Sequence, residues 1–224
     1  MRFGKGEKWG TKILWILVLF GVLLRFVALS SDPYTHLSWS AALLTDEGFY
    51  LHNARNLVLF GQPQLDDFQN RLIMPTLHLA QVGIFSALPF HLVTARLFTV
   101  LCSLLTLALF WLALRRAFNA QVALYGLLFL SLDPVFLLYN RMALMDTPAT
   151  LLLVLGFALF VFGVQFGSHK ALCLMGFCLG LAFSVRGLLL LLVPLPLLLL
   201  RKQRGDCLWV GAGLGLFLLP YLLF

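Results

Sequence analysis

Long apolar runs bounded by basic residues constrain this chain more than any other feature. One run covers 13–29, another 96–114, and a third, 171–200, holds a single charged residue, Arg186. An apolar helix of about 20 residues is long enough to cross the hydrocarbon core of a bilayer. The chain is 61% hydrophobic and 11% charged, with a mean hydropathy of +0.96, and a soluble domain of 224 residues could not bury so much apolar surface. We therefore predict an all-α polytopic membrane protein.

The apolar runs predict about seven transmembrane helices in one module covering 1–224. The first span is 13–29, an outer loop with interfacial amphipathic helices covers 30–95, and 96–224 holds spans two to seven. As one helix, the run 171–200 would reach about 45 Å, well beyond a hydrocarbon core of about 30 Å. We therefore expect two short helices that turn near Arg186 and Gly187. The last span is still in progress at Phe224, so we expect a truncated chain, the N-terminal part of a longer protein.

Charge sets the predicted orientation. If the N-terminus is cytoplasmic, the inner segments hold ten of the 16 Lys and Arg residues and two of the nine acids, which leaves six basic residues and seven acids outside. This is the positive-inside bias of membrane proteins. The inner residues are Arg2, Lys5, Lys8, Lys12, Arg115, Arg116, Lys170, Arg201, Lys202 and Arg204, with Glu7 and Asp206. We expect a multi-pass protein of the plasma (inner) membrane with its first long loop outside.

Several other classes of function are not supported. The net charge of +7 could suggest nucleic-acid binding, but the basic residues stand at the ends of apolar runs rather than in a patch. The four cysteines lie in or beside apolar runs without metal-site spacing, and we interpret them as small hydrophobic residues. No His-x-x-x-His or comparable spacing indicates a histidine-ligated metal. The basic N-terminus followed by an apolar run with Arg25 predicts a retained signal anchor, in which Arg25 extends toward the interface.

The most polar sustained segment is 44–56. We expect Thr45 to cap a short interfacial helix whose first turn contains Asp46 and Glu47. One face of this helix carries the apolar residues Tyr50, Leu51, Ala54, Leu57 and Val58. The opposite face, turned to water, carries the polar residues His52, Asn53, Arg55 and Asn56. The two carboxylates could serve acid–base chemistry beside a lipid. The alternative is that they only charge a helix N-terminus, which acids in a first turn commonly do.

Eight ionisable residues fall outside or at the outer ends of predicted helices. They are Asp46, Glu47, Arg55, Arg71, Arg96, Arg141, Asp146 and Arg186. Individually, an interface anchor, a structural ion pair or a snorkelling arginine explains each of them. Together they predict an outward-facing cavity, with carboxylates for a hydroxyl nucleophile and guanidinium groups for a phosphate.

The order of these elements resembles the N-terminal part of GT-C fold glycosyltransferases, in the group of protein O-mannosyltransferases and the lipid A aminoarabinose transferase. The likeness runs through nearly the whole chain. It rests on Arg25, Asp46-Glu47, Met74-Pro75-Thr76-Leu77, Ala95-Arg96-Leu97, Asp133-Pro134, Tyr139-Asn140-Arg141, Asp146, Gly180-Leu181-Ala182 and Arg186-Gly187. The chain departs from the group at Ile73-Met74-Pro75, where a basic residue and two prolines are usual, and at Arg186, where Lys is usual.

The resemblance implies transfer of a sugar from a polyprenyl-phosphate carrier to a lipid, glycan or protein acceptor outside the cytoplasm, by a single inverting displacement. It implies Asp46 as the base, with Glu47 as its support or as a contact for a divalent metal. It further implies Asp146 as a residue that orients Arg141 or the acceptor. Arg141, Arg186 and Arg96 would hold the phosphate. No cofactor is otherwise expected.

Two rival functions remain. A transporter or lipid flippase would place ionisable residues at mid-membrane depth on broken helices and would show an internal repeat. We find no repeat, and the charges lie at helix ends on one side. An inactive membrane scaffold is compatible with a truncated chain.

Overall fold

A computed structural model describes residues 5–30, 41–65, 70–200 and 204–223, and these residues form helices and short connections without a strand. The elements are α1 (Lys5–Leu24), α2 (Ala41–Phe60), α3 (Asn70–Ile73), α4 (Pro75–Ala87), α5 (Leu92–Ala117), α6 (Ala120–Leu132), α7 (Pro134–Asn140), α8 (Asp146–Phe166), α9 (His169–Val185), the 3-10 helix η2 (Gly187–Leu192), α10 (Pro194–Leu199) and α11 (Arg204–Leu223). The all-helical prediction is confirmed for this part of the chain.

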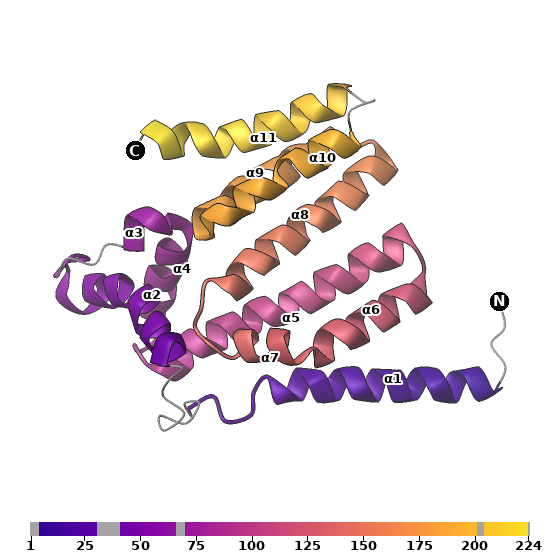
Figure 1. Ribbon diagram of the computed structural model, residues 1–224, viewed down its shortest axis with the longest axis horizontal. Helices are drawn as coiled ribbons and strands as arrows, with labels where there is room; N and C mark the ends of the chain where they lie inside the picture. The colour runs from indigo at the N-terminus through magenta and orange to yellow at the C-terminus, as the bar shows by residue number, and fades with distance from the viewer. Residues whose placement is uncertain (1–4, 31–40, 66–69, 201–203, 224) are drawn as a thin grey trace.

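The long helices form a layer with a cap of shorter helices at one end (Figure 1). Helices α1, α6, α5, α8, α9 and α11 follow one another across the view, while α2, α3 and α4 cover the left-hand end. The turns α5–α6 and α8–α9 lie at the right-hand end, where the chain also begins. The α7–α8 connection lies at the left-hand end, beside the cap. The helices of the predicted outer loop, α2, α3 and α4, therefore gather at one end of the long helices.

Only part of the predicted set of spans meets a strict length and hydropathy test. Within the described residues, α5 and α8 are long and apolar enough to cross a membrane, and α6 with α7 makes a third candidate that bends by 65° at their junction. Shorter apolar helices cover Trp9–Leu24, His169–Val185, Gly187–Leu199 and Gly205–Leu219. Seven crossings therefore remain a prediction.

Pro134 explains the bend between α6 and α7. Proline has no N–H to continue the helical ladder, so a helix commonly ends just before it. Asp133 then caps the new helix, because its side chain accepts a hydrogen bond of 2.6 Å from the backbone N–H of Phe136. The predicted helix end near Asp133-Pro134 is confirmed, whereas the third span remains a prediction.

The run 171–200 is divided as predicted. Helix α9 ends at Val185, and Arg186 leaves the helix with an extended backbone (φ −143°, ψ 104°). The second limb is η2 followed by α10, so it consists of a 3-10 segment and a short helix rather than one α-helix. The break places Arg186 at the junction of the two limbs.

Three predictions about α2 were wrong. The helix begins at Ala41, so Thr45 is not its cap and its first turn contains no acid. Ala and Leu are strong helix formers, and 41–44 consists of these two residue types, which explains the earlier start. Asn53 and Asn56 are buried rather than turned to water, and the Asn53 side chain donates a 2.8 Å bond to the Pro63 carbonyl.

Arg25 does not extend to the interface as predicted. Its side chain is fully buried, and one guanidinium nitrogen donates to the carbonyls of Gly21 (2.6 Å) and Ser131 (3.0 Å). The guanidinium also lies 5.7 Å from the centre of the Phe136 ring. The reason is the α6–α7 bend, which interrupts the helical ladder next to Ser131 and leaves its carbonyl open to an outside donor.

Cys102, Cys173, Cys178 and Cys207 are all free thiols, which agrees with their interpretation as small hydrophobic residues.

Close packing of α9 on α11 depends on glycine. A Cβ atom at Gly213 would lie 1.8 Å from the Cys173 carbonyl oxygen, and one at Gly176 would lie 2.1 Å from the Val210 carbonyl oxygen. The two backbones therefore approach more closely than any other residue type would allow, as is common between membrane helices.

Candidate active site

A buried ion pair links the cap to the long helices. Arg96, in the first turns of α5, donates from Nε to Glu47 Oε1 (2.8 Å) and from Nη2 to Glu47 Oε2 (2.6 Å), and both side chains are 2% exposed. Arg96 Nη1 also donates to the Leu29 carbonyl (2.9 Å), and Glu47 Oε1 accepts from the Ala143 N–H (2.6 Å). One pair of side chains thus joins α2, α5, the segment after α1 and the α7–α8 connection.

This pair changes what two predicted site residues can do. The Arg96 guanidinium is buried and bound to a carboxylate and a carbonyl, so the geometry favours a positioning role over phosphate binding. Both oxygens of Glu47 are engaged, so its carboxylate does not fit the metal contact that the resemblance implied. Within the described residues, no group of three or more His, Cys, Asp and Glu side chains gathers to hold a metal.

A second cluster lies where α2 faces the α9–η2 junction. Arg186 and Asp146, at the N-terminus of α8, form an ion pair between Nη1 and Oδ1. Tyr50 of α2 lies within the electrostatic reach of both Asp46 and Arg186. Burial and the Asp46 carboxylate raise the pKa of Tyr50, while the Arg186 charge opposes this shift. Asp46, Tyr50, Asp146 and Arg186 therefore share one neighbourhood, in which the phenol keeps its proton at neutral pH.

The members of this cluster remain accessible. In the ion pair, the side chain of Arg186 is 35% exposed and that of Asp146 is 23% exposed, whereas Glu47 and Arg96 are closed off. No other hydrogen bond or ion pair from Arg186 to a described side chain is present beyond Asp146, so its remaining N–H groups can reach an outside anion. The resemblance had implied that Asp146 orients Arg141 or the acceptor. Among the described residues, Asp146 forms its ion pair with Arg186.

Arg141 takes a different place. It follows α7 and donates from Nη2 to the Val27 carbonyl, while its Nε is buried without a partner. Next to it Asn140 is fully buried, with Oδ1 accepting from Thr147 Oγ1 (3.1 Å) and Nδ2 left without a partner. Two unsatisfied donors thus stand side by side in the chain, close in sequence to Asp146. A phosphate-binding role for Arg141 remains a prediction.

A hydrogen bond that the sequence did not predict fixes the end of α9, just before Arg186. Thr76 Oγ1 lies 2.5 Å from Ser184 Oγ, and Ser184 donates to the Leu181 carbonyl (2.8 Å), so Thr76 is the donor between the two hydroxyl groups. This bond ties α4 to α9 two residues before Arg186. No signal in the sequence links two hydroxyl residues 108 positions apart. Tyr50 was also missed as a site residue, although its i, i+4 spacing from Asp46 on α2 could have indicated it.

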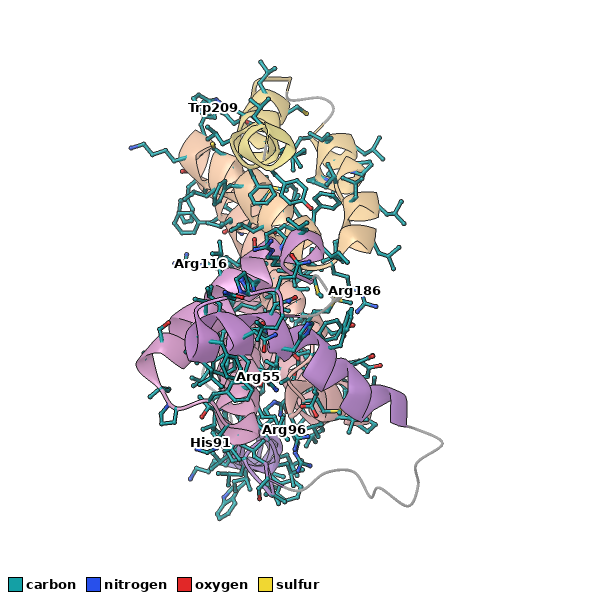
Figure 2. All side chains as sticks on the ribbon, turned by 90° about the vertical axis from the view of Figure 1, so that its left-hand side faces the viewer. Arg55, His91, Arg96, Arg116, Arg186 and Trp209 are labelled. Atoms are coloured by element: carbon teal, nitrogen blue, oxygen red, sulfur yellow. The ribbon has the colours of Figure 1, made fainter. Side chains whose placement is uncertain are left out.

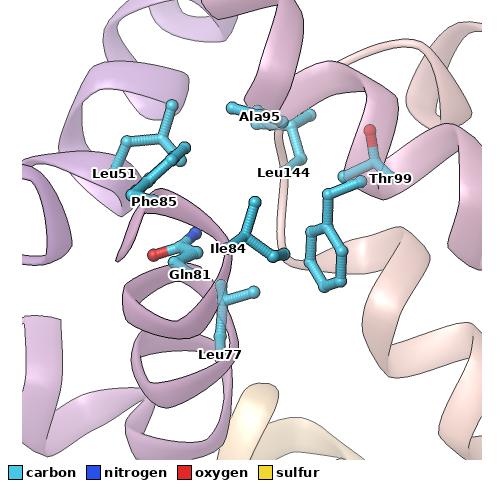
Figure 3. Close-up of a pocket in the computed structure, with 10 residues that line it drawn as sticks. Leu51, Leu77, Gln81, Ile84, Phe85, Ala95, Thr99 and Leu144 are labelled. Carbon is cyan, nitrogen blue, oxygen red and sulfur yellow. The ribbon is translucent and has the colours of Figure 1, made fainter. Parts of the chain in front are cut away.

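The enclosed void nearest to α2 is not a substrate site. It has a volume of about 10 Å³, the space of a single water molecule, and lies between α2, α4, α5 and the α7–α8 connection (Figure 3). Gln81, whose Oε1 has no partner, lines it with Thr99 among apolar residues such as Leu51, Phe85 and Leu144. A bound sugar would not fit there. The half-buried Asp46–Arg186 neighbourhood, which solvent can reach, is thus the better candidate for substrate.

The comparison with protein families decides between the functions that the sequence left open. The model for the dolichyl-phosphate-mannose-protein mannosyltransferases matches residues 75–224, which is 150 of the 224 residues. The chain belongs to this family. It is therefore a multi-pass membrane glycosyltransferase of the mannosyltransferase type. No curated protein and no solved structure matches the chain at a significant level.

The family model matches only part of the candidate site. The match begins at Pro75, so it includes Arg96, Arg141, Asp146 and Arg186 but not α2. Asp46 is connected to the matched region by the structure. The neighbouring Glu47 is bound to Arg96 and to the Ala143 N–H, which fixes the rotation of α2 about its axis. Adjacent residues on a helix point about 100° apart, so Asp46 takes a different direction from Glu47.

Proposed function

We propose that this chain transfers a sugar from a polyprenyl-phosphate carrier to an acceptor hydroxyl outside the cytoplasm, with inversion at the anomeric carbon. The observation that carries the proposal is the shared neighbourhood of Asp46, Tyr50 and the Arg186–Asp146 ion pair, at the end of the helices opposite the chain's start (Figure 1). A carboxylate and an accessible guanidinium are the groups that this reaction needs. The family match supports a glycosyltransferase.

In the proposed reaction, Asp46 accepts the proton of the acceptor hydroxyl while the hydroxyl oxygen attacks the anomeric carbon of the donor sugar. The bond between that carbon and the carrier phosphate oxygen breaks, and the electron pair leaves with the phosphate. Arg186 stabilises the leaving phosphate, because guanidinium remains charged and can bind two oxygens at once. Asp146 orients Arg186 through their ion pair. Arg141 is a second cation for the phosphate on the same side of the membrane.

The acceptor class and the orientation are part of the same proposal. Seven crossings with a cytoplasmic N-terminus would put α2–α4 and the α9–η2 junction outside, where the carrier-linked sugar and a lipid, glycan or protein acceptor meet. The basic residues at the other end of the helices support this orientation, since Arg115 and Arg116 end α5 and Lys170 begins α9.

The substitution Asp46→Asn tests the proposed base. It keeps the size of the side chain and removes its charge, so the rate of sugar transfer should fall by about two orders of magnitude or more. Carrier binding should change little, because the phosphate contacts Arg186. The measurements are transfer rate and carrier affinity of purified protein in liposomes, with a panel of polyprenyl-phosphate sugars.

Asp206→Asn is the matched control, because Asp206 lies 3.5 Å from His169, where α9 and α11 begin, away from the cap. Its transfer rate should match that of the unmodified protein. Near-normal transfer by Asp46→Asn would show that this carboxylate is not the base.

A further inference from the structure

A hollow on the far side of α2 has no role in the proposed reaction. It has a volume of about 320 Å³ and is lined by Glu47, Gly48, Leu51, His52, Arg55, Phe90 and Leu92. Gly48, His52 and Arg55 follow one another on a single face of α2 at helical spacing, and Asp46 and Tyr50 lie on a different face. In the end-on view, Arg186 lies well to one side of Arg55 and Arg96 (Figure 2). The hollow is thus distinct from the candidate active site.

Within the described residues, one positive charge that lines the hollow has no acidic partner. The Glu47 carboxylate that borders it is neutralised by Arg96, so the pair contributes no net charge. Arg55 is exposed, and no described acidic side chain forms an ion pair with it. His52 uses Nδ1 to bond the Phe49 carbonyl (2.9 Å), which holds the imidazole against α2. Among the described residues that line the hollow, Arg55 is therefore the arginine without an ion-pair partner.

The N-terminus of α5 adds to the positive electrostatic potential at the hollow. Leu92 lines the hollow and is the first residue of α5, and the preceding His91 makes no capping bond with its side chain. The first amides of a helix have no partner within the helix, and its N-terminus carries a partial positive charge. Arg55 and the end of a 26-residue helix therefore both favour an anion at the hollow.

The rest of the lining is apolar, and its place in the fold indicates a lipid. Leu51, Phe90 and Leu92 provide most of the non-polar wall, and Leu59, 53% exposed, continues the same face of α2 one turn beyond Arg55. Helix α5 is long and apolar enough to span a membrane, and a spanning α5 would place its first residue near the edge of the hydrocarbon region. A ligand there has its charged group beside Arg55 and its apolar part in the bilayer.

We propose that this hollow binds the phosphodiester headgroup of an anionic membrane phospholipid, with Arg55 as its charged contact and the apolar wall against the glycerol and first acyl carbons. The volume is at the low end of the range of about 300–1,000 Å³ typical of small-molecule sites, which suits a headgroup and not a whole lipid. The site is separate from the carrier phosphate at Arg186, so the proposal does not depend on the proposed reaction.

The test uses the purified protein in nanodiscs made from equal parts phosphatidylcholine and phosphatidylglycerol. After mild detergent extraction, native mass spectrometry measures the ratio of the two lipids retained by the protein. The unmodified protein should retain phosphatidylglycerol in excess. Arg55→Gln should reduce that excess about fivefold, the usual scale for one basic side chain at an anionic membrane surface.

A second variant blocks the space without touching the charge. A Cβ atom at Gly48 would meet nothing within 4 Å, so Gly48→Leu fits its helix and fills part of the hollow. It should lower phosphatidylglycerol retention as Arg55→Gln does. The matched control is Gly83→Leu, a glycine of α4 with equally open surroundings. It should leave the lipid ratio unchanged.

Two outcomes overturn the proposal. One is an unchanged lipid ratio in both Arg55→Gln and Gly48→Leu. The other is release of the retained phosphatidylglycerol by millimolar inorganic phosphate, which would assign the hollow to a free anion.

Discussion

At the scale of single residues, the Glu47–Arg96 pair determines how the cap attaches to the long helices. Burying two charges costs several kcal/mol of desolvation for each ion, and only good geometry with further hydrogen bonds offsets that cost. Here the two charged side chains make two hydrogen bonds to each other, and each makes one more to the backbone. The pair thus holds α2 in one rotation, with Asp46 directed away from it.

A double-mutant cycle tests this role. Glu47→Leu or Arg96→Met alone should each destabilise the protein by about 3–5 kcal/mol, because each leaves a buried charge without its partner. The double variant should lose much less than the sum, since no unpaired charge remains. The measurement is the free energy of unfolding in mixed micelles. Additive losses would contradict a coupled pair.

At the scale of elements, α9 and α11 depend on contact between their backbones. Gly176 and Gly213 each lie against a carbonyl oxygen of the opposite helix, and a side chain at either position would push the helices apart. This packing holds α9, and the Thr76–Ser184 bond then ties the end of α9 to α4. Arg186 follows two residues after Ser184, so its position depends on both contacts.

Glycines on two faces of α11 provide a matched comparison. Gly213→Ala should destabilise the protein by about 1–3 kcal/mol, the usual cost of overpacking a tight contact. Gly211→Ala should be neutral or slightly stabilising, because its Cβ atom would meet nothing within 4 Å and Ala is the better helix former by about 1 kcal/mol. Thermal unfolding in detergent measures both. Equal effects of the two substitutions would contradict the packing described here.

At the scale of the whole molecule, the helices run between two ends of different character. The right-hand end in Figure 1 holds the α5–α6 turn beside Arg115 and Arg116, and the left-hand end holds the cap and the candidate site. A membrane protein with its basic turns inside would have the cap outside. The two ends would then face different compartments, which matters for a donor carried on a membrane lipid.

Cysteine labelling in intact cells tests this orientation. Gln64→Cys, next to α2, should react with an impermeant thiol reagent, whereas Ala117→Cys, at the end of α5, should react only after the membrane is permeabilised. Both side chains are exposed in the structure, so access to the reagent depends on the compartment. Labelling of the unmodified chain gives the background from its four native cysteines. The reverse pattern would place the candidate site in the cytoplasm.

The sequence alone determined the features that depend on local composition and on length. Apolar runs and their charged ends predicted an all-helical membrane protein, the helix end at Asp133-Pro134 and the break at Arg186, because a continuous helix over 171–200 would be too long for a bilayer. Asp46, Asp146 and Arg186 were among eight ionisable residues placed on the outer side from residue type and position, and the family resemblance supplied their roles. These predictions needed no knowledge of which segments touch.

Only the tertiary structure decided which charges meet. The sequence separates Arg96 from Glu47 by 49 residues and Arg25 from Ser131 by 106, and in this apolar chain several charges could have supplied either partner. The residue pattern placed Arg25 at the interface and the resemblance gave Arg96 to phosphate, whereas the fold buries both. The physical reason is that a buried guanidinium must find acceptors wherever packing leaves them, and packing is a property of the whole chain.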